Sequence, residues 1–280
     1  MQLKVRKFDP DTMKPNRITL CVGRRSTGKS SLLIDLLYRT RDRYDYVMGF
    51  CPTYEGAAAL RRCIPDACVY DQYNASKVDA LVKTAQELVA QGKKRSMLLV
   101  LDDCLYDSSI ARGTNTSFRC IFMNGRHLNL SLIILAQWAL DLPPAIRSQV
   151  DYVFQFKDNI LANKIKIYKM FFGVFQFDEF CAVMERCTQN YECLCIDNTL
   201  QSTSPVDCVS WYKAQINLPE FSLGRKIFFQ MTDNTRRPAG SYVREEEDPQ
   251  GKSKLRVTVT KEGDGDDPEG GGGGGPDEVR

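Results

Sequence analysis

Short apolar runs alternate with amphipathic runs along most of the chain. The apolar runs have the length of buried strands, and in the amphipathic runs the apolar residues recur at helical spacing. Strands are predicted over residues 18–22, 44–53, 67–71, 96–103, 130–137, 151–156 and 191–199. Helices are predicted over residues 30–39, 55–65, 74–94, 108–129 and 159–189, and a loop with a short helix over 141–149.

This alternation favours an α/β fold. Strands that are apolar along their whole length are typical of a parallel sheet that helices cover on both faces. Ligands of such sheets bind beyond the carboxyl ends of the strands. We therefore expect a mostly parallel central sheet with helices on both faces, and we expect every candidate functional residue at a carboxyl end of a strand.

The composition changes near residue 236. From there the sequence is polar, rich in Gly and Pro and acidic at its end, so it cannot bury enough apolar surface to fold alone. We predict a folded domain over residues 1–235 and a flexible tail over residues 236–280. The tail is either a linker without a role or an interaction segment.

Charge and cysteine content exclude some classes of protein. The formal net charge of the 280-residue chain is +3, so nucleic-acid binding would need local basic patches. Eleven cysteines without a visible signal peptide indicate reduced thiols in a cytosolic protein that is not secreted, and their spacings do not match a C-x-x-C zinc pattern. The longest apolar candidate, over residues 128–142, is interrupted by polar residues, so no membrane-spanning segment is expected.

A glycine-bounded loop joins the first predicted strand to the first predicted helix. Gly23, four residues, then Gly28, Lys29 and Ser30 form a P-loop pattern, and the strand before it and the helix after it are the context that this motif requires. In such a loop the backbone N–H groups and the helix dipole bind an anion, the lysine reaches the β- and γ-phosphates, and the serine hydroxyl contacts Mg²⁺. The residues expected to contact the nucleotide are Gly23, Arg24, Arg25, Ser26, Thr27, Gly28, Lys29, Ser30 and Ser31.

Two aspartates end a second apolar strand and fit a Walker-B motif. Asp102 would hold the Mg²⁺ shell with Ser30, and Asp103 would polarise the attacking water, because water is a poor nucleophile that must be oriented and deprotonated. At least one predicted strand lies between the P-loop and these acids in the chain, which suits P-loop proteins with an additional strand between the P-loop strand and the Walker-B strand. A GTPase would also carry an Asn-Lys-x-Asp loop, and the sequence has none.

Other polar residues follow or precede the remaining strands. Gln137, at the end of a buried strand, could contact the γ-phosphate or the attacking water, or simply cap the strand. Arg126 and Arg147 suit transition-state phosphoryl charge, because guanidinium is always ionised and binds in a bidentate manner. Either could act from a neighbouring subunit as an arginine finger, and each alone could equally be a surface residue. His127, the single histidine, is more typical of a structural role.

Together these segments resemble the genome-packaging ATPases of nucleocytoplasmic large DNA viruses, a branch of the FtsK–HerA superfamily. The resemblance covers residues 17–214 and includes VLDDCLYD, MNGRHLNLSLIILAQWALDLPPAIRSQVDYVF and CLCIDNTLQSTSPVDCVSWYKA. It implies a RecA-like P-loop ATPase of the additional-strand type that uses ATP and Mg²⁺. In that family pattern Lys29, Asp103 and Gln137 are catalytic, Ser30 and Asp102 hold the metal, and Arg147 or Arg126 is the finger, with Arg147 favoured.

The resemblance also implies a motor that translocates double-stranded DNA into a capsid. A homo-oligomeric ring, sequence-independent DNA contact, a capsid or portal partner, and a location at assembly sites in the host cytoplasm or in the virion would follow. Candidate DNA contacts are Arg61 and Arg62, or Arg112 and Arg119. A helicase of the same superfamily, a nucleotide kinase and an ATP-gated scaffold remain alternatives. The chain has Asp102-Asp103 where relatives outside the viruses often have Asp-Glu, so the placement of the water is open.

Overall fold

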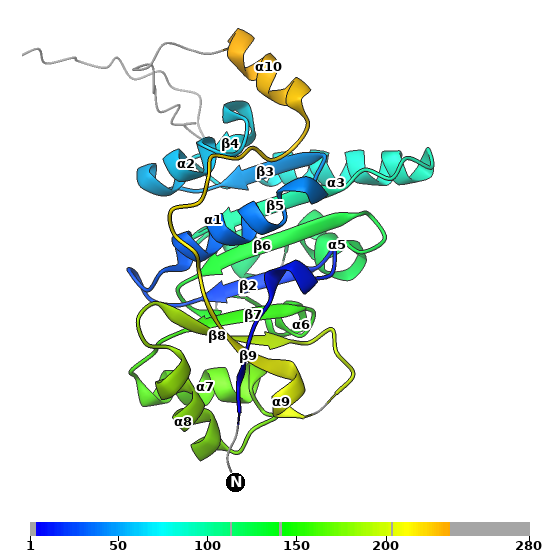
Figure 1. The fold of residues 1–280 in the computed structure, drawn as a ribbon. Helices are drawn as coiled ribbons and strands as arrows, with labels where there is room; N and C mark the ends of the chain where they lie inside the picture. Colours follow the sequence, from blue (N-terminus) through cyan, green and yellow to red (C-terminus); the bar gives the residue numbers. More distant parts are fainter. Residues whose placement is uncertain (1–3, 113, 140–141, 203, 236–280) are drawn as a thin grey trace, which may run out of the picture. The chain divides into compact units, whose positions relative to one another are not determined.

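A single sheet organises the residues that the structure, a computed structural model, describes, which are 4–112, 114–139, 142–202 and 204–235. Its strand order is β1-β9-β8-β7-β2-β6-β5-β3-β4 (Figure 1). All neighbouring strands pair in parallel except at β8, which is antiparallel to both of its neighbours. The strands are β1 Arg6–Lys7, β2 Ile18–Val22, β3 Tyr46–Phe50, β4 Val69–Tyr70, β5 Met97–Asp102, β6 Leu130–Ala136, β7 Tyr152–Phe156, β8 Glu192–Asp197 and β9 Val209–Lys213.

The centre of the sheet has the additional-strand arrangement. β6 pairs with the P-loop strand β2 on one side and with the Walker-B strand β5 on the other. The predicted fold class is therefore confirmed, although the strand that separates the two motifs in space follows both of them in the chain. The strands that lie between the motifs in the sequence, β3 and β4, lie beyond β5 at the edge of the sheet.

Helices cover both faces of the sheet and enclose two apolar clusters. One cluster packs α1 and α2 against one face of the sheet, and the other packs α3, α5, α6, α7 and α8 against the opposite face. The helices are α1 Lys29–Arg39, α2 Tyr54–Arg61, α3 Ala75–Ala90, α4 Ser108–Ala111, α5 Thr116–Asn124, α6 Pro144–Arg147, α7 Leu161–Phe171, α8 Phe177–Cys187, α9 Pro205–Cys208 and α10 Lys226–Thr235. Single 3-10 turns occur at η1 Pro10–Thr12, η2 Arg41–Arg43 and η3 Asp66–Cys68.

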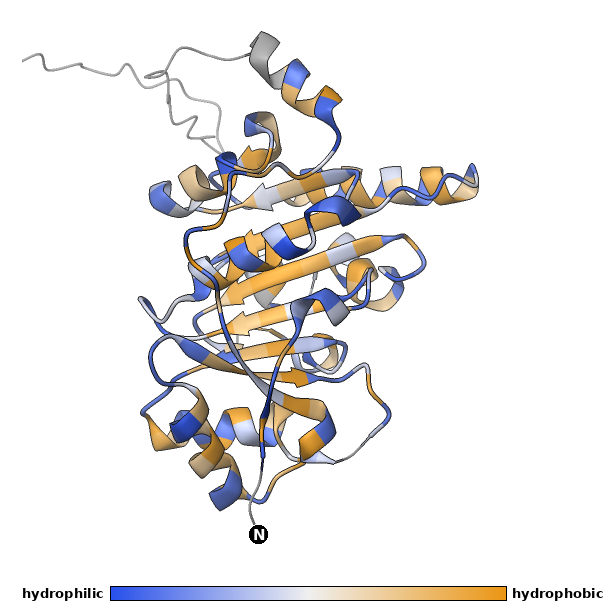
Figure 2. Cartoon of the chain, viewed as in Figure 1, coloured by the Kyte–Doolittle hydropathy of each residue, from blue (hydrophilic) through white to orange (hydrophobic). Residues whose placement is uncertain are grey.

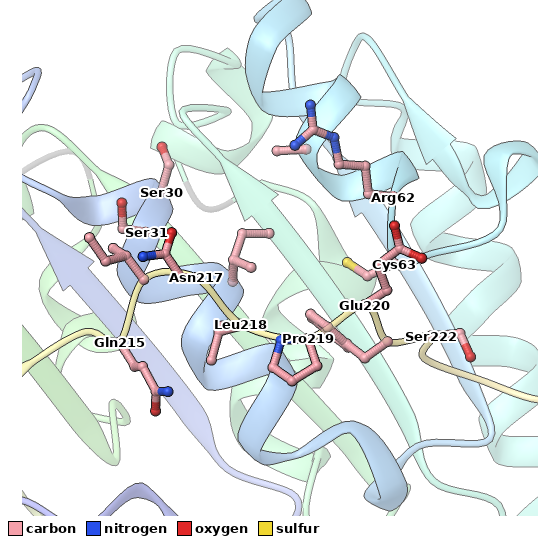
Figure 3. A pocket seen from close by; sticks show the side chains of 14 residues that line it. Ser30, Ser31, Arg62, Cys63, Gln215, Asn217, Leu218, Pro219, Glu220 and Ser222 are labelled. Carbon is pink, nitrogen blue, oxygen red and sulfur yellow. The ribbon is translucent and has the colours of Figure 1, made fainter.

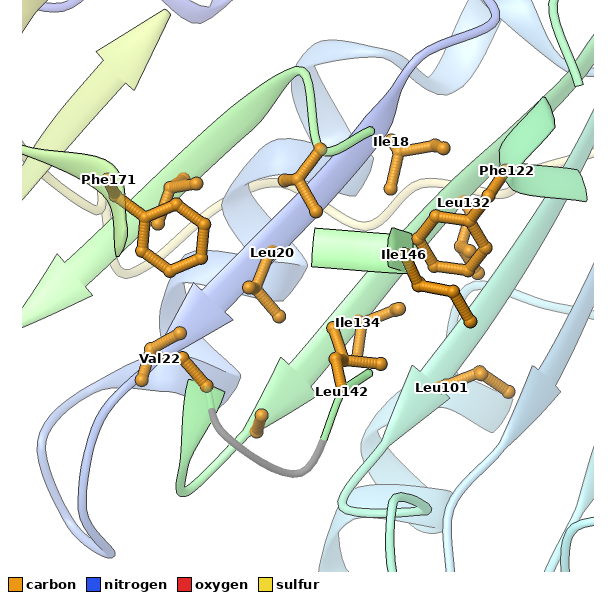
Figure 4. Close-up of a cluster of buried hydrophobic side chains, with 14 of the residues drawn as sticks. Ile18, Leu20, Val22, Leu101, Phe122, Leu132, Ile134, Leu142, Ile146 and Phe171 are labelled. Carbon is orange, nitrogen blue, oxygen red and sulfur yellow. The ribbon is translucent and has the colours of Figure 1, made fainter. Parts of the chain in front are cut away.

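The hydropathy of the chain follows this layering. The central strands are apolar along their length and the outer faces of the helices are polar (Figure 2). On the second face, side chains of β2 and β6 meet aromatic and aliphatic groups from α5, α6 and α7 (Figure 4). The members of this cluster that Figure 4 labels are Ile18, Leu20, Val22, Leu101, Phe122, Leu132, Ile134, Leu142, Ile146 and Phe171. This core fixes the position of the strand ends from which the candidate site is built.

Two segments predicted as single helical stretches are each divided in two. Within 108–129, the Asn115 side chain accepts a hydrogen bond from the backbone N–H of Phe118 and begins α5 as a separate helix. Within 159–189, α8 begins with a capping box between Gln176 and Glu179. In both cases a side-chain cap satisfies N–H groups that a new helix leaves without partners, and it sets the start of that helix.

After β9 the chain crosses the α1 face of the sheet toward α10 (Figure 1). We call residues 214–225 the strap. It is anchored at its start by the backbone N–H of Gln215, which donates to the buried carboxylate of Asp35 on α1 (3.0 Å). At its far end the backbone N–H of Leu223 donates to the carbonyl of Cys63 (2.7 Å). The strap therefore extends the folded unit beyond β9 and is tied by hydrogen bonds to α1 and to the segment after α2.

The described part of the predicted domain begins at residue 4 and ends with α10 at Thr235. The predicted tail, 236–280, lies outside the described residues. All eleven cysteines are free thiols. Within the described part of the chain, no helix combines the length and the apolar character that crossing a membrane requires.

Candidate nucleotide-binding site

The P-loop leaves the carboxyl end of β2 and leads directly into α1. The backbone N–H of Gly23 donates to the carbonyl of Ala136 (3.1 Å), which ties the start of the loop to the end of β6. Gly28 has a φ of 103°, a left-handed conformation that side chains disfavour, and it precedes the first helical residue, Lys29. The loop therefore presents the N-terminus of α1 at the carboxyl edge of the sheet, where an anion is stabilised.

The Lys29 side chain is folded onto the loop that precedes it. Its ammonium group donates to the carbonyls of Gly23 (2.6 Å) and Arg24 (2.9 Å). Burial lowers the pKa of Lys29, and the nearby carboxylates of Asp103 and Asp102 oppose this shift. A half-buried ammonium group with only neutral carbonyl partners is well suited to exchange those partners for phosphate oxygens.

Asp102 ends β5 and lies on the same edge of the sheet. Its carboxylate is buried (8% exposed) and accepts a hydrogen bond from the thiol of Cys51 (3.3 Å), which follows β3. Burial is the main cause that raises the pKa of Asp102. Gly56 of α2 packs against the same carboxylate so closely that a Cβ there would lie 3.1 Å from Asp102 Oδ2. The close approach of α2 thus encloses this acid from the side of β3.

The donor set at this edge fits Mg²⁺. Carboxylate and hydroxyl oxygens are the ligands that this ion prefers, and it usually takes one or two from the protein and the rest from phosphates and water. Asp102 is a buried carboxylate that accepts a hydrogen bond from a weak thiol donor, so its negative charge is incompletely compensated. Among the described residues no group of three or more His, Cys, Asp or Glu could hold a metal ion. Asp102 and Ser30 are the carboxylate and the hydroxyl that could hold the ion at this edge.

Asp103 and Gln137 are joined by a hydrogen bond. The Gln137 amide donates to Asp103 Oδ2 (2.7 Å), and the Asp103 backbone N–H donates to the carbonyl of Leu135 (3.1 Å). Asp103 has a φ of 54°, which turns its side chain out of the line of β5. Because β5 and β6 are parallel neighbours, the residues that follow the two strands lie side by side. The sequence predicted that both residues lie at this edge, but it did not predict the hydrogen bond between them.

Arg126 and Arg147 do not lie at this edge. Arg126 comes just before β6 and Arg147 just before β7, so both are near the amino ends of the parallel strands. The expectation that every candidate would lie at a carboxyl end is therefore wrong for these two. Arg126 pairs with the buried carboxylate of Asp151 (2.8 Å), which also accepts from the backbone N–H of Ile18 (2.9 Å). Arg147 lies against Met170 of α7, with Nη1 2.9 Å from the sulfur.

The candidate DNA-contacting arginines differ in their surroundings. Arg61 is held by Asp66 (2.8 Å) and Asp71 (2.7 Å) and is largely buried, so its charge is engaged within the chain. Arg62, Arg112 and Arg119 are exposed, and so is His127. The exposed arginines remain candidates for contact with a polyanion, whereas Arg61 does not.

A groove opens on the α2 side of the P-loop. It has a volume of about 970 Å³ and lies between α1, α2 and the strap (Figure 3). Ser30 and Ser31 line one end, Arg62 and Cys63, which follow α2, line another part, and strap residues such as Asn217 complete it. The start of α1 is thus accessible from this side.

Sequence reasoning missed the residues that contact the motifs from other segments. Cys51 follows β3, and its contact with Asp102 could be found only by knowing that β3 pairs with β5. Tyr191 directly precedes β8 and lies beside Gly28 of the P-loop. In the sequence Tyr191 is the first residue of a predicted strand, and only the antiparallel direction of β8 brings that start to this edge.

Comparison with known proteins settles the family. The profile of the poxvirus A32 protein family matches residues 6–215, which is more than half of the chain. The chain belongs to the poxvirus A32 protein family. This match confirms the resemblance to packaging ATPases of large DNA viruses that the sequence motifs indicated.

Curated proteins of several viruses align with this A32-family chain. Uncharacterized protein 015R of frog virus 3 is 34% identical over 195 residues, which cover 69% of this chain and 60% of that protein. Uncharacterized protein 088R of invertebrate iridescent virus 3 is 28% identical over 227 residues, covering 76% of this chain and 85% of that protein. The chain therefore spans less than two thirds of the frog virus protein and most of the iridescent virus protein.

Solved structures share the fold of this A32-family chain. The DNA-packaging ATPase B204 of Sulfolobus turreted icosahedral virus superposes with a TM-score of 0.54 at 18% identity, over 73% of this chain and all of B204. The packaging NTPase B204 of Sulfolobus turreted icosahedral virus 2, solved with AMPPCP, gives 0.51 at 17% identity, over 72% of this chain and all of B204. At these identities the similarity establishes the P-loop ATPase fold.

Proposed function

We propose that this chain is an ATP-hydrolysing motor that translocates double-stranded viral DNA into a capsid. The observation that carries the proposal is the gathering of Lys29, Asp102, Asp103 and Gln137 at one edge of an additional-strand sheet, in a chain of the poxvirus A32 family. Support also comes from B204, which shares the fold and is a DNA-packaging ATPase. The chemistry needed for hydrolysis is complete at this edge except for a transition-state cation.

In this mechanism Lys29 and Gln137 give up their present hydrogen bonds within the chain and bind the nucleotide or the attacking water. The Lys29 ammonium leaves the carbonyls of Gly23 and Arg24 and binds the β- and γ-phosphates of ATP. Ser30 and Asp102 would hold Mg²⁺, which would supply positive charge to the phosphates when bound. Asp103 orients the attacking water and accepts its proton, and Gln137 exchanges Asp103 for the γ-phosphate or that water.

The missing cation comes from a neighbouring copy in a ring. Arg147 is the favoured finger, because among the described residues it has no carboxylate partner, whereas Arg126 is held by Asp151 of its own chain. A guanidinium supplied across a subunit boundary stabilises the charge of the transferred phosphoryl group and links hydrolysis in one subunit to movement of the next. Arg126 is the alternative finger, and its use would require the pair with Asp151 to open.

The DNA contacts are electrostatic and independent of sequence. The exposed side chains of Arg62, Arg112 and Arg119 are the candidates for the channel surface, since phosphate contacts position DNA without reading bases. A capsid or portal protein is the docking partner, and the assembly site in the host cytoplasm or the virion is the location. In this proposal residues 1–235 form the motor domain and residues 236–280 a flexible tail.

The test is the steady-state ATPase rate with and without long double-stranded DNA, measured for wild type and Lys29→Ala. Strong stimulation by duplex DNA that is lost in the variant supports a DNA-driven motor. Stimulation by single strands in preference to duplex would support a helicase. Absence of any stimulation by duplex, with phosphate passed to a nucleoside and not to water, would overturn the proposal in favour of a kinase.

A further inference from the structure

The direction of β8 brings an aromatic residue to the P-loop. β8 is antiparallel to β7, so its first residues pair with the last residues of β7, with Cys193 opposite Phe156. β7 in turn is the parallel neighbour of β2, from which the P-loop emerges (Figure 1). The turn between α8 and β8 therefore lies at the edge of the sheet where phosphate binds, and Tyr191 is its last residue.

Tyr191 borders the glycine that precedes the phosphate-binding lysine. A Cβ placed on Gly28 would lie 3.5 Å from both Cβ and Cδ1 of Tyr191. Tyr191 itself is 68% exposed, so its ring faces solvent beside the loop and is not packed in the core. A large exposed aromatic next to a ligand-binding loop offers a flat apolar surface to whatever the loop binds.

The backbone at this turn is held in an unusual conformation. Asn190 has a φ of 50° and Tyr191 a φ of 65°. Asn adopts the left-handed region readily, but for a bulky aromatic residue this conformation is an outlier, and such outliers cluster at ligand-binding sites. The turn is fixed by the backbone N–H of Glu192, which donates to the carbonyl of Gln189 (2.8 Å). Since the Tyr191 side chain gains little burial, packing does not explain why tyrosine occupies a strained position.

The two sides of the P-loop differ in chemistry. Asp102, Asp103 and Gln137 lie on the side of β5 and β6, and Tyr191 lies on the opposite side, toward β7 and β8. A triphosphate whose γ-phosphate faces the carboxylates directs its nucleoside away from them. The nucleoside then passes over the end of β2 toward β8, where Tyr191 is.

We propose that Tyr191 is the stacking platform for the nucleobase of the bound nucleoside triphosphate. The proposal rests on the proposed function only in that the P-loop binds a triphosphate. The ring contacts the face of the base and does not read its edge, so we expect purines to bind better than pyrimidines through contact area, with little discrimination between adenine and guanine.

The test compares ATP with a ligand that has no base. Dissociation constants for MgATP and for inorganic tripolyphosphate with Mg²⁺ are measured by calorimetry on wild type, Tyr191→Ala and Tyr191→Phe. Tyr191→Ala should weaken ATP about tenfold, within the range of aromatic–base stacking, and leave tripolyphosphate within about twofold. Tyr191→Phe should bind both ligands like wild type. Unchanged ATP affinity in Tyr191→Ala, or equal loss for both ligands, would overturn the proposal.

Two further variants separate stacking from structure. Tyr54→Ala removes another exposed tyrosine (80% exposed), on the β5 side of the P-loop, and should leave the ATP affinity within about twofold of wild type. Tyr191→Asn places a residue that tolerates the left-handed region, so its thermal midpoint should equal or exceed that of wild type while ATP binding falls as in Tyr191→Ala. If Tyr54→Ala lost ATP affinity and Tyr191→Ala did not, the base would bind on the β5 side of the P-loop and the proposal would be overturned. If wild type bound neither MgATP nor tripolyphosphate, the triphosphate site of the proposed function would be overturned, and the stacking proposal with it.

Discussion

The amide of Gln137 donates a hydrogen bond of 2.7 Å to the carboxylate of Asp103, so the residue proposed to sense the γ-phosphate holds the residue proposed to activate water. The two come from the ends of the parallel neighbours β6 and β5. While this bond exists, one oxygen of Asp103 is occupied and its charge is partly compensated. Nucleotide that draws Gln137 toward phosphate would release Asp103, which links the presence of the γ-phosphate to activation of the base.

The first prediction concerns Asp103. Asp103→Asn keeps the shape and the hydrogen bond to Gln137 but removes the capacity to accept a proton. We expect kcat to fall by about 10²- to 10⁴-fold, with ATP affinity within about threefold of wild type, because the base acts in the chemical step. Single-turnover hydrolysis together with ATP titration measures both. Retention of more than about a tenth of kcat would assign water activation to another group.

Gln137→Ala is expected to behave differently from Asp103→Asn. Asp103 loses a donor and stays charged, so the base remains present while the γ-phosphate contact is lost. We expect a fall in kcat of about 10- to 100-fold and a smaller difference between ATP and ADP affinities. The ATP and ADP dissociation constants and kcat provide the measurement, with the exposed Gln91→Ala as matched control. An unchanged ATP-to-ADP affinity ratio would argue that Gln137 only caps β6.

The buried charge of Asp102 predicts a pH-dependent stability difference. Burial raises the pKa of Asp102, so between its ordinary value near 3.9 and the raised value the folded state binds more protons than the unfolded state. Stability from this group is therefore greatest in acid and is lost as the pH rises through that window. Asp102→Asn should make the nucleotide-free protein more stable than wild type at pH 7, by roughly 1 kcal/mol, and this gain should vanish below about pH 4.

Denaturant unfolding at several pH values measures this difference. Asp42→Asn is the matched control, since the Asp42 side chain is 87% exposed and its substitution should change the unfolding free energy by less than about 0.5 kcal/mol at any pH. A destabilised Asp102→Asn at pH 7 would mean that the neighbouring thiol and Lys29 compensate the charge more fully than burial penalises it.

Another prediction concerns the attachment of the strap to α1. Asp35 is fully buried and accepts hydrogen bonds from the Tyr212 hydroxyl, the Gln215 backbone N–H (3.0 Å) and Arg39 Nε (3.4 Å). Asp35→Ala leaves these donors without their acceptor and should cost about 3–5 kcal/mol of unfolding free energy, whereas Tyr212→Phe removes one donor and should cost about 1 kcal/mol. Chemical denaturation measures both, and hydrogen exchange over residues 214–222 should accelerate first. Equal costs for the two variants would contradict this ranking.

The sequence allowed the central architecture and one side of the site to be predicted because both depend on local signals. Two motifs can be recognised from the residues around them: the glycine spacing with Lys29, and the apolar run that ends in Asp102 and Asp103. Parallel strands bring the carboxyl ends on which such motifs lie to one edge. What could not be predicted depends on strand order and direction. Cys51 reaches Asp102 because β3 pairs with β5, and Tyr191 reaches Gly28 because β8 is antiparallel.

The same reasoning explains why the arginines were placed at the wrong edge. In the sequence Arg126 and Arg147 stand among the most specific segments, but each precedes its strand, so a parallel sheet carries it to the edge opposite the P-loop. Attention to chain direction alone would have predicted this. Neither arginine therefore lies beside the P-loop of its own chain. A cation for the transition state would have to come from a neighbouring copy.

Mixing two inactive variants tests whether Arg147 acts across a subunit boundary. Lys29→Ala lacks phosphate binding in its own site, and Arg147→Ala lacks the finger, so each alone should hydrolyse ATP at least about 100-fold more slowly than wild type. In an equimolar mixture, roughly a quarter of the sites would combine an intact Lys29 with an intact Arg147 from the neighbour, and activity should return to about that fraction. If Arg147 acted on the site of its own chain, each Arg147→Ala subunit would lack its finger and each Lys29→Ala subunit its lysine, so mixing would restore nothing. Arg126→Ala mixed in the same way provides the comparison, and recovery with Arg126→Ala in place of Arg147→Ala would reassign the finger to Arg126.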